Sequence, residues 1–386
     1  MATVAPVAAR VRLRSLDLIR GVVMVLMAVD HVRVYSGVPA GGRAAGIFFT
    51  RWITHFCAPV FVFFAGTAAY LHGRRLGGPG PLARFLVTRG LLLIVLELTV
   101  IRAGWTFGFD YSQFLLAGVI WMLGWCMVLL AGLIWLPTWA IGTFGLLVIA
   151  FQPVAGAIGT ALPEAWHPLW EFLYPVGAEV KLGADGPDVA VLYTIVPWIG
   201  VMAAGYAFGA VMSREPAARD RWCVRVGLSA IALFLAGATA QILFTPGGDN
   251  PAPVWFRLLN QAKYPASQLF LLMTLGPAIA LVPFAERARG WLAGVFVTFG
   301  RVPMFYYLLH IPLIHLTSLV VWYVRDGRFD NTPFATAPYV SIPPNARWSL
   351  TLLYFVVLVN VALLYIACRW FAGVKARGRA GWLQYI

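Results

Sequence analysis

Two ionisable side chains near the start of the chain have the types and the spacing of a chemical site. Arg20 and His31 lie in the apolar stretch SLDLIRGVVMVLMAVDHVRVYSG, residues 15–37. In an α-helix, eleven residues at about 100° and about 1.5 Å each place both side chains on one face, about 16 Å apart. A guanidinium can bind phosphate bidentately, and histidine transfers protons near neutral pH. A phosphate-bearing donor with a long arm would bridge the two residues, and acyl-coenzyme A is such a molecule.

The apolar surroundings of this pair favour a functional interpretation. An ionisable residue inside a membrane span costs about 3 kcal/mol on insertion scales and usually serves a function. The alternative is that Arg20 extends to the interface and that His31 is hydrogen-bonded inside the helix bundle. Asp17 lies one turn before Arg20, and we expect it to orient the guanidinium that binds the donor.

Other charged residues inside apolar segments are expected to form pairs. Asp30 points away from the face of Arg20, and it could pair with Arg33 or with Arg102, in a structural or a functional role. Glu97 and Arg102 are five residues apart in LELTVIRAGW, and a structural ion pair is the expectation for them. Glu97 could instead hold a neighbouring histidine or a group of CoA.

Three further residues are candidates for the same site. His55 lies near the outer start of the second apolar segment, where it could share a cavity with His31 or face lipid headgroups. His310, in GRVPMFYYLLHIPLIHL, could bind the acceptor, act as a second acid or base, or form a buried hydrogen bond. Arg301 could join Arg20 in holding phosphate, or mark the inner boundary of its helix.

The sequence predicts no metal site. His310 and His315 are five residues apart on one predicted helix and face different directions, which argues against a two-histidine site. The four cysteines are scattered, without the CxxC or Cys/His spacing typical of zinc. They are Cys57, Cys126, Cys223 and Cys368.

The composition is that of a polytopic membrane protein. Of 386 residues, 61% are hydrophobic and only 11% are charged, whereas soluble domains contain about 25% charged residues. The net charge of +14 could indicate nucleic-acid binding. The basic residues, however, cluster between apolar segments, which favours membrane topology over nucleic acid as their cause.

Apolar runs of about 20 residues predict an all-α protein with ten transmembrane helices. We expect residues 1–386 to form a single membrane-embedded domain, with residues 290–300 as a short interfacial helix capped by Gly300. The GYAFG sequence, with Gly205 and Gly209, is expected to let two helices pack closely. The predicted spans are 16–36, 49–71, 85–103, 114–134, 138–158, 191–212, 226–244, 266–285, 302–324 and 348–371.

The distribution of charge predicts the orientation. Basic segments alternate with longer loops that mix acidic, basic and proline residues, as the positive-inside rule requires if both termini are cytoplasmic. We expect a multi-pass protein of the bacterial inner membrane, in contact with membrane lipids. The segments expected to face the cytoplasm are the N-terminus, 72–84, 135–138, 213–225, 286–289 and the C-terminal tail from residue 369, and all of them except WLPT at 135–138 are basic.

Four sequence blocks resemble a known group of membrane proteins. An Arg, ten residues and a His in the first span form the R-X10-H pattern of the acyltransferase-3 families. The blocks resemble, in order, those of the DUF1624 group, which is related to the catalytic domain of heparan-alpha-glucosaminide N-acetyltransferase. They are RSLDLIRGVVMVLMAVDH, THFCAPVFVFFAGTAAYL, YTIVPWIGVMAAGYAFG and FGRVPMFYYLLHIPLIH.

The resemblance implies a ten-helix enzyme that moves an acyl group, usually acetyl, from cytosolic acyl-CoA to an acceptor at or beyond the outer leaflet. Arg20 and His31 match the R-X10-H pattern, which implies donor binding and catalysis. The acceptor is expected to offer a hydroxyl or amine, as a carbohydrate does. A transporter or flippase of an anionic solute is the alternative from another functional class.

Overall fold

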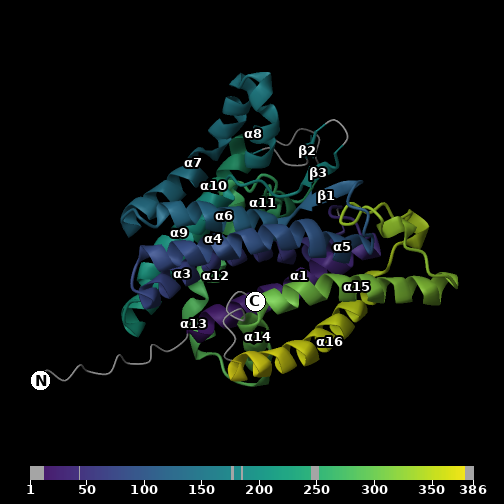
Figure 1. Cartoon of the computed structure of the whole chain (residues 1–386). Helices are drawn as coiled ribbons and strands as arrows, with labels where there is room; N and C mark the ends of the chain where they lie inside the picture. The colour runs from purple at the N-terminus through teal and green to yellow at the C-terminus, as the bar shows by residue number, and fades with distance from the viewer. Residues whose placement is uncertain (1–12, 43, 175–177, 184–185, 245–251, 379–386) are drawn as a thin grey trace, which may run out of the picture.

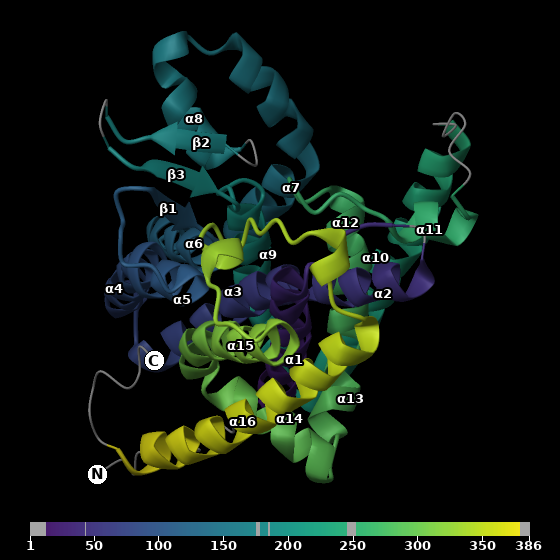
Figure 2. The same ribbon diagram turned by 90° about the vertical axis from the view of Figure 1, so that its right-hand side faces the viewer.

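The chain is built around its first long helix. The computed structural model describes residues 13–42, 44–174, 178–183, 186–244 and 252–378. Helix α1 (Arg14–Ser36) is surrounded by α3, α13, α14, α15 and α16, and Figures 1 and 2 show it in the middle of the molecule. The backbone N–H groups of Arg14 and Ser15 donate to the Glu286 carboxylate, at 3.3 and 2.8 Å. This carboxylate complements the positive end of the helix dipole and fixes where α1 begins.

Helices dominate the remaining structure. The other α-helices are α2 (Ala45–Trp52), α3 (Cys57–Leu76), α4 (Pro79–Leu96), α5 (Arg102–Thr106), α6 (Val119–Leu133), α7 (Thr138–Ala161), α8 (His167–Leu173), α9 (Trp198–Met212), α10 (Pro216–Phe244), α11 (Val254–Leu259), α12 (Gln268–Ala280), α13 (Val282–Arg287), α14 (Trp291–Arg301), α15 (Pro303–Asp326) and α16 (Leu350–Arg377). A π-helical turn, Glu97–Ile101, joins α4 to α5.

The helices have the length and composition of a multi-pass membrane protein. Within the described residues, six helical segments are long and apolar enough to cross a membrane, and two shorter apolar helices, α6 and α9, accompany them. Helix α1 is not among the six, because its charged residues lower its apolar character. The ten-span topology and its orientation remain predictions. The six segments are Ala45–Leu76, Thr138–Ala161, Pro216–Phe244, Gln268–Arg287, Pro303–Asp326 and Leu350–Arg377.

The all-α prediction is wrong at one end of the molecule, where three short strands form a sheet. β1 (Phe114–Ala117) pairs in parallel with β3 (Asp188–Val191), and β2 (Ala178–Lys181) pairs with β3 antiparallel. The predicted spans 114–134 and 191–212 therefore begin too early, since their helices start at Val119 and Trp198. When a short apolar strand runs directly into an apolar helix, the sequence shows no change of periodicity that would mark where the strand ends and the helix begins.

The predicted helix at 290–300 exists as α14, but it packs against α1. Gly300 lies within α14 and does not cap it: a Cβ at this position would be 1.8 Å from the Asp17 carbonyl oxygen. The predicted close packing at GYAFG is confirmed, because a Cβ on Gly205 would be 2.0 Å from the Phe63 oxygen of α3. These two contacts hold α14 and α9 against the helices that carry the candidate site.

The helix bundle has two chemically different ends. At the first, called the basic end, α3 turns into α4, α9 into α10 and α14 into α15, and α16 ends there (Figure 1). The opposite end carries the three-stranded sheet and is called the sheet end. The N-terminal residues 1–12 and the tail after residue 378, both predicted to be basic cytoplasmic segments, lie outside the described residues.

Candidate active site

One cavity of about 880 Å³ follows α1 from the basic end to the sheet end. Asp17 and Arg20 line its first part, and Asp30 and His31 line its far part. Arg20 and His31 therefore face one space, as their eleven-residue spacing predicts. The other walls come from α3, α4, α6, α9 and α15.

The basic end of the cavity has a large excess of positive charge. Arg20 and Arg301, both named from the sequence, lie here, and Arg20 Nη2 donates to the Phe64 carbonyl oxygen at 2.6 Å. Asp17 and Glu215 are the acidic residues among the lining residues at this end. The additional bases come from helix ends that the sequence marks as basic segments, and from the interior of α4. They are His72, Arg74, Arg75, Arg89, Arg214, Arg219 and Lys375.

The middle of the cavity is apolar. The lining side chains named below come from four helices, α1, α3, α4 and α6, and an uncharged linear chain could pass between them with little desolvation cost. Charged groups are thus confined to the two ends, as an elongated ligand with a polyanionic head would require. The apolar lining includes Met27, Phe61, Val62, Leu93, Leu123 and Met127.

Two histidines meet at the far part of this cavity. His31 Nδ1 lies 2.7 Å from His310 Nε2, and His310 Nδ1 lies 2.7 Å from the Tyr307 carbonyl oxygen. A carbonyl oxygen only accepts, so His310 Nδ1 must carry the proton that it donates to Tyr307. Neutral His310 then accepts at Nε2, and His31 donates from Nδ1. This arrangement leaves a lone pair on Nε2 of His31, the residue of the two that lines the cavity.

The two histidines thus differ in what they can do. His310 is fully buried and does not line the cavity, so it orients His31 from behind. Trp105 packs edge-on against the His31 ring at a centroid distance of 4.8 Å. The His31 imidazole is therefore held in one orientation by a hydrogen bond and a ring contact, as a general base requires.

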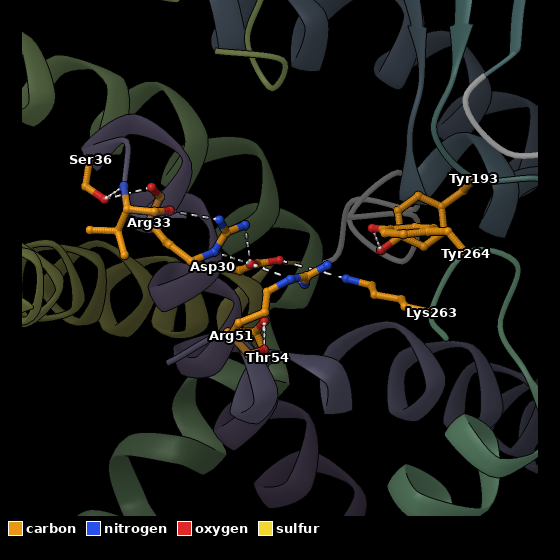
Figure 3. Close-up of polar contacts among 9 residues, drawn as sticks. Asp30, Arg33, Ser36, Arg51, Thr54, Tyr193, Lys263 and Tyr264 are labelled. Atoms are coloured by element: carbon orange, nitrogen blue, oxygen red, sulfur yellow. Dashed lines mark hydrogen bonds and ion pairs between the residues drawn. The ribbon is translucent and has the colours of Figure 1, made fainter. Parts of the chain in front are cut away.

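Beside His31, Asp30 is the centre of a charged cluster that we call the Asp30 cluster (Figure 3). Its carboxylate oxygens lie 3.1 Å from Arg33, 3.7 Å from Arg51 and 3.9 Å from Lys263. The predicted partner Arg33 is thus confirmed. The other alternative, Arg102, is wrong, because its guanidinium donates to three backbone carbonyl oxygens at the sheet end.

The predicted Glu97–Arg102 ion pair is also absent from the described contacts. Glu97 is buried and accepts from the backbone N–H of Ile120 at 3.0 Å, in the first turn of α6. The carboxylate therefore complements the N-terminus of α6, where the helix dipole favours negative charge. Sequence spacing cannot reveal this partner, because it lies on another helix.

His55 is near the Asp30 cluster but outside the cavity lining. It is buried against Phe270, edge-on at a centroid distance of 5.4 Å, and it does not line the cavity. Neither of the two alternatives describes His55: its side chain is outside the cavity lining, and it is buried and does not face headgroups, because the η1 turn that carries it (Ile53–Phe56) directs it towards α12.

His315 has a structural environment. Its Nε2 donates to the Asn331 side-chain oxygen at 2.7 Å, and its ring stacks on Phe107. Within the described ranges, no three His, Cys, Asp or Glu side chains come together in a way that could hold a metal ion. The four cysteines are buried and free.

Comparison with known protein families shows to which family the chain belongs. The family described as heparan-alpha-glucosaminide N-acetyltransferase, catalytic, matches residues 12–245. The chain belongs to this family. No curated protein sequence matches the chain. Membership of this family indicates that the chain is an acetyltransferase, and its long apolar helices indicate a multi-pass membrane protein.

The family match contains only part of the cavity. Arg20, His31 and the α3–α4 and α9–α10 turns lie inside residues 12–245, whereas Lys263, Arg301 and His310 lie beyond it. The segments outside the matched range therefore supply the residue that orients His31 and one cation of the Asp30 cluster.

Proposed function

We propose that the whole chain is one membrane-embedded acyltransferase domain that uses acyl-CoA, in practice acetyl-CoA, as donor. The observation that carries the proposal is the continuous cavity between a cation-rich end and an oriented histidine. The phosphates of CoA would bind Arg20 and Arg301, with Asp17 positioning Arg20, because guanidinium groups suit phosphate. The uncharged pantetheine arm would lie in the apolar middle and bring the thioester to His31.

The transfer step requires one base and no external oxidant or reductant. His31 Nε2 takes the proton of the acceptor O–H or N–H as the acceptor oxygen or nitrogen attacks the thioester carbon. The new C–O or C–N bond forms, the C–S bond breaks, and the departing thiolate receives the proton from His31, so that CoA leaves as the free thiol. His310 holds His31 in the required tautomer. His55 contacts neither reactant in this scheme.

The proposal follows the R-X10-H pattern that the sequence shares with the acyltransferase-3 families, and it has the donor enter from the cytosol and the acceptor from the envelope side. A transporter would move its solute through the molecule unchanged. Such a function would not use the oriented, proton-accepting nitrogen of His31. Release of free CoA from acetyl-CoA in the presence of an acceptor separates the two functions, because a transporter does not break the thioester.

The donor site is tested by acetyl-CoA binding to detergent-purified protein, with wild type beside Arg20→Ala. A hydrogen bond to a charged group contributes about 1.5–3 kcal/mol, so we expect calorimetry to show about tenfold to hundredfold weaker binding in the variant. Arg328→Ala is the control, because Arg328 is exposed at the sheet end. Absence of acetyl-CoA binding in folded wild type, or equal binding in Arg20→Ala, would contradict the proposal.

A further inference from the structure

The sheet end of the cavity lies beside a cluster of side chains that has more positive than negative charge, of which Asp30 and Lys263 line the cavity. The Asp30 cluster contains one carboxylate and three cations, those of Arg33, Arg51 and Lys263. If all four groups are ionised, their charges sum to about +2, and the side chains are between 5 and 18% exposed. A buried positive charge without a matching anion is costly in a low-dielectric interior. An anionic group entering the cavity here would remove that cost.

Lys263 is the cation with an incomplete set of partners. Its side chain is 5% exposed and lines the cavity. Its ammonium lies 3.9 Å from Asp30, beyond hydrogen-bond distance, and 5.1 and 5.8 Å from the ring centroids of Tyr264 and Tyr193. No described residue accepts a hydrogen bond from this ammonium, although it has three protons to donate. A ligand in the cavity can accept them.

A hydroxyl group lies on the same side of the cavity. The hydroxyl of Tyr264 donates to that of Tyr193 at 3.2 Å, which leaves the proton of Tyr193 available for another acceptor. Tyr193 lines the cavity together with Lys263, Asp30 and His31, and Figure 3 shows its ring beside Lys263. An ammonium and a phenol O–H are thus available to one oxyanion near the base.

We propose that the acceptor of the transfer reaction is anionic, and that its carboxylate or phosphate ester binds Lys263 and Tyr193 while its hydroxyl or amine meets His31. Asp30, which also pairs with Arg33 and Arg51, holds Lys263 in place. The inference rests on the proposed acyl transfer and adds to it the charge class of the acceptor. The donor phosphates occupy the basic end, so the two anionic groups bind at opposite ends of one cavity.

The test compares three sugar acceptors that share an amine and differ in charge. Purified protein is supplied with acetyl-CoA and with glucosamine, glucosamine 6-phosphate or muramic acid, and CoA release gives kcat/KM for each. We expect the phosphate or the carboxylate sugar to exceed glucosamine by at least tenfold, because each gains charge-assisted hydrogen bonds. Which of the two is preferred distinguishes a phosphate from a carboxylate acceptor.

Variants assign the preference to Lys263. Lys263→Met keeps the approximate length of the side chain and removes its charge. We expect the variant to use the anionic sugars and glucosamine with about equal kcat/KM, while its acetyl-CoA affinity, measured by calorimetry, stays unchanged. Lys263→Arg is expected to keep the preference. Lys181→Met is the control, because Lys181 is exposed on β2, outside the cavity.

Three results would overturn the inference while acyl transfer stands. These are equal use of the three sugars by wild type, a preference that survives in Lys263→Met, and an acetyl-CoA affinity that falls tenfold in Lys263→Met, since the cations would then hold the donor. Absence of CoA release with every acceptor, together with absence of acetyl-CoA binding, would instead reject the proposed function. The wild-type comparison needs no variant, so a Lys263→Met protein that fails to fold does not prevent the test.

Discussion

At the scale of single residues, a chain of three hydrogen-bonding groups determines which atom of His31 faces the cavity. The Tyr307 carbonyl fixes the tautomer of His310, and His310 fixes that of His31. Enzymes commonly orient a catalytic histidine with a carboxylate. Here a second, buried histidine orients it, so that no additional negative charge is placed beside the thioester.

Substitutions of His310 test this positioning role. Gln at position 310 offers an amide oxygen that can accept from His31 Nδ1, whereas Leu offers none. We expect His310→Leu to lower kcat by about hundredfold, within the range of general-base catalysis, and His310→Gln to stay within about tenfold of wild type. KM for acetyl-CoA should not change in either variant. Steady-state kinetics, with His31→Ala as the inactive reference, measure both quantities.

His167→Gln is the matched control, since His167 is exposed on α8, far along the chain from the cavity-lining residues. Equal losses in His310→Leu and His310→Gln, accompanied by lower melting temperatures, would instead assign His310 a role in packing. Restored activity in His310→Gln is a result that a purely structural role does not explain.

At the scale of elements, glycine contacts set the width of the cavity. Helices α3 and α9 both line it, and they meet where Gly205 lies against the Phe63 carbonyl oxygen. A larger residue at this contact must move one helix, because the opposing atom belongs to the backbone and cannot rotate away.

Gly205→Val is therefore expected to destabilise the protein by about 2 kcal/mol, a typical cost of overpacking, and to reduce transfer activity. Gly132→Val in α6 is the control, because a Cβ there would meet nothing within 4 Å. Thermal unfolding in detergent measures the difference. A melting temperature for Gly205→Val equal to that of the control would show that the helices separate without cost.

The same scale shows what the sequence could predict. Within the described residues, helices occur close to the predicted positions, and six helical segments are long and apolar enough to cross a membrane. Long apolar runs between basic turns leave few alternatives to such helices. Arg20 and His31 share a cavity because helix geometry alone aligns them. The partners of Glu97, Asp30 and His310 come from other helices, and Lys263 lies in a loop without a motif. These contacts depend on how distant helices pack together, and residue spacing within one segment does not predict that packing.

At the scale of the whole molecule, the proposal requires the basic end to face the cytosol and the sheet end to face outward. The interval between Lys181 and Ala217 determines this orientation, because α9 is the one α-helix that lies wholly within its described residues, and it has only 15 residues. Such a helix is about 22 Å long, shorter than the roughly 30 Å hydrocarbon core of a bilayer. The bend and turn residues between β3 and Trp198 must then complete the crossing.

Labelling of introduced cysteines with a membrane-impermeant maleimide determines this orientation. Lys181→Cys lies on β2 and Ala217→Cys at the start of α10; both positions are exposed, and neither lines the cavity. The native cysteines are buried, so background labelling should be low. We expect Lys181→Cys to react in intact cells and Ala217→Cys to react only after permeabilisation. Labelling of both positions in intact cells would mean that α9 does not cross the bilayer, and the reverse pattern would put the donor site on the wrong side for cytosolic acyl-CoA.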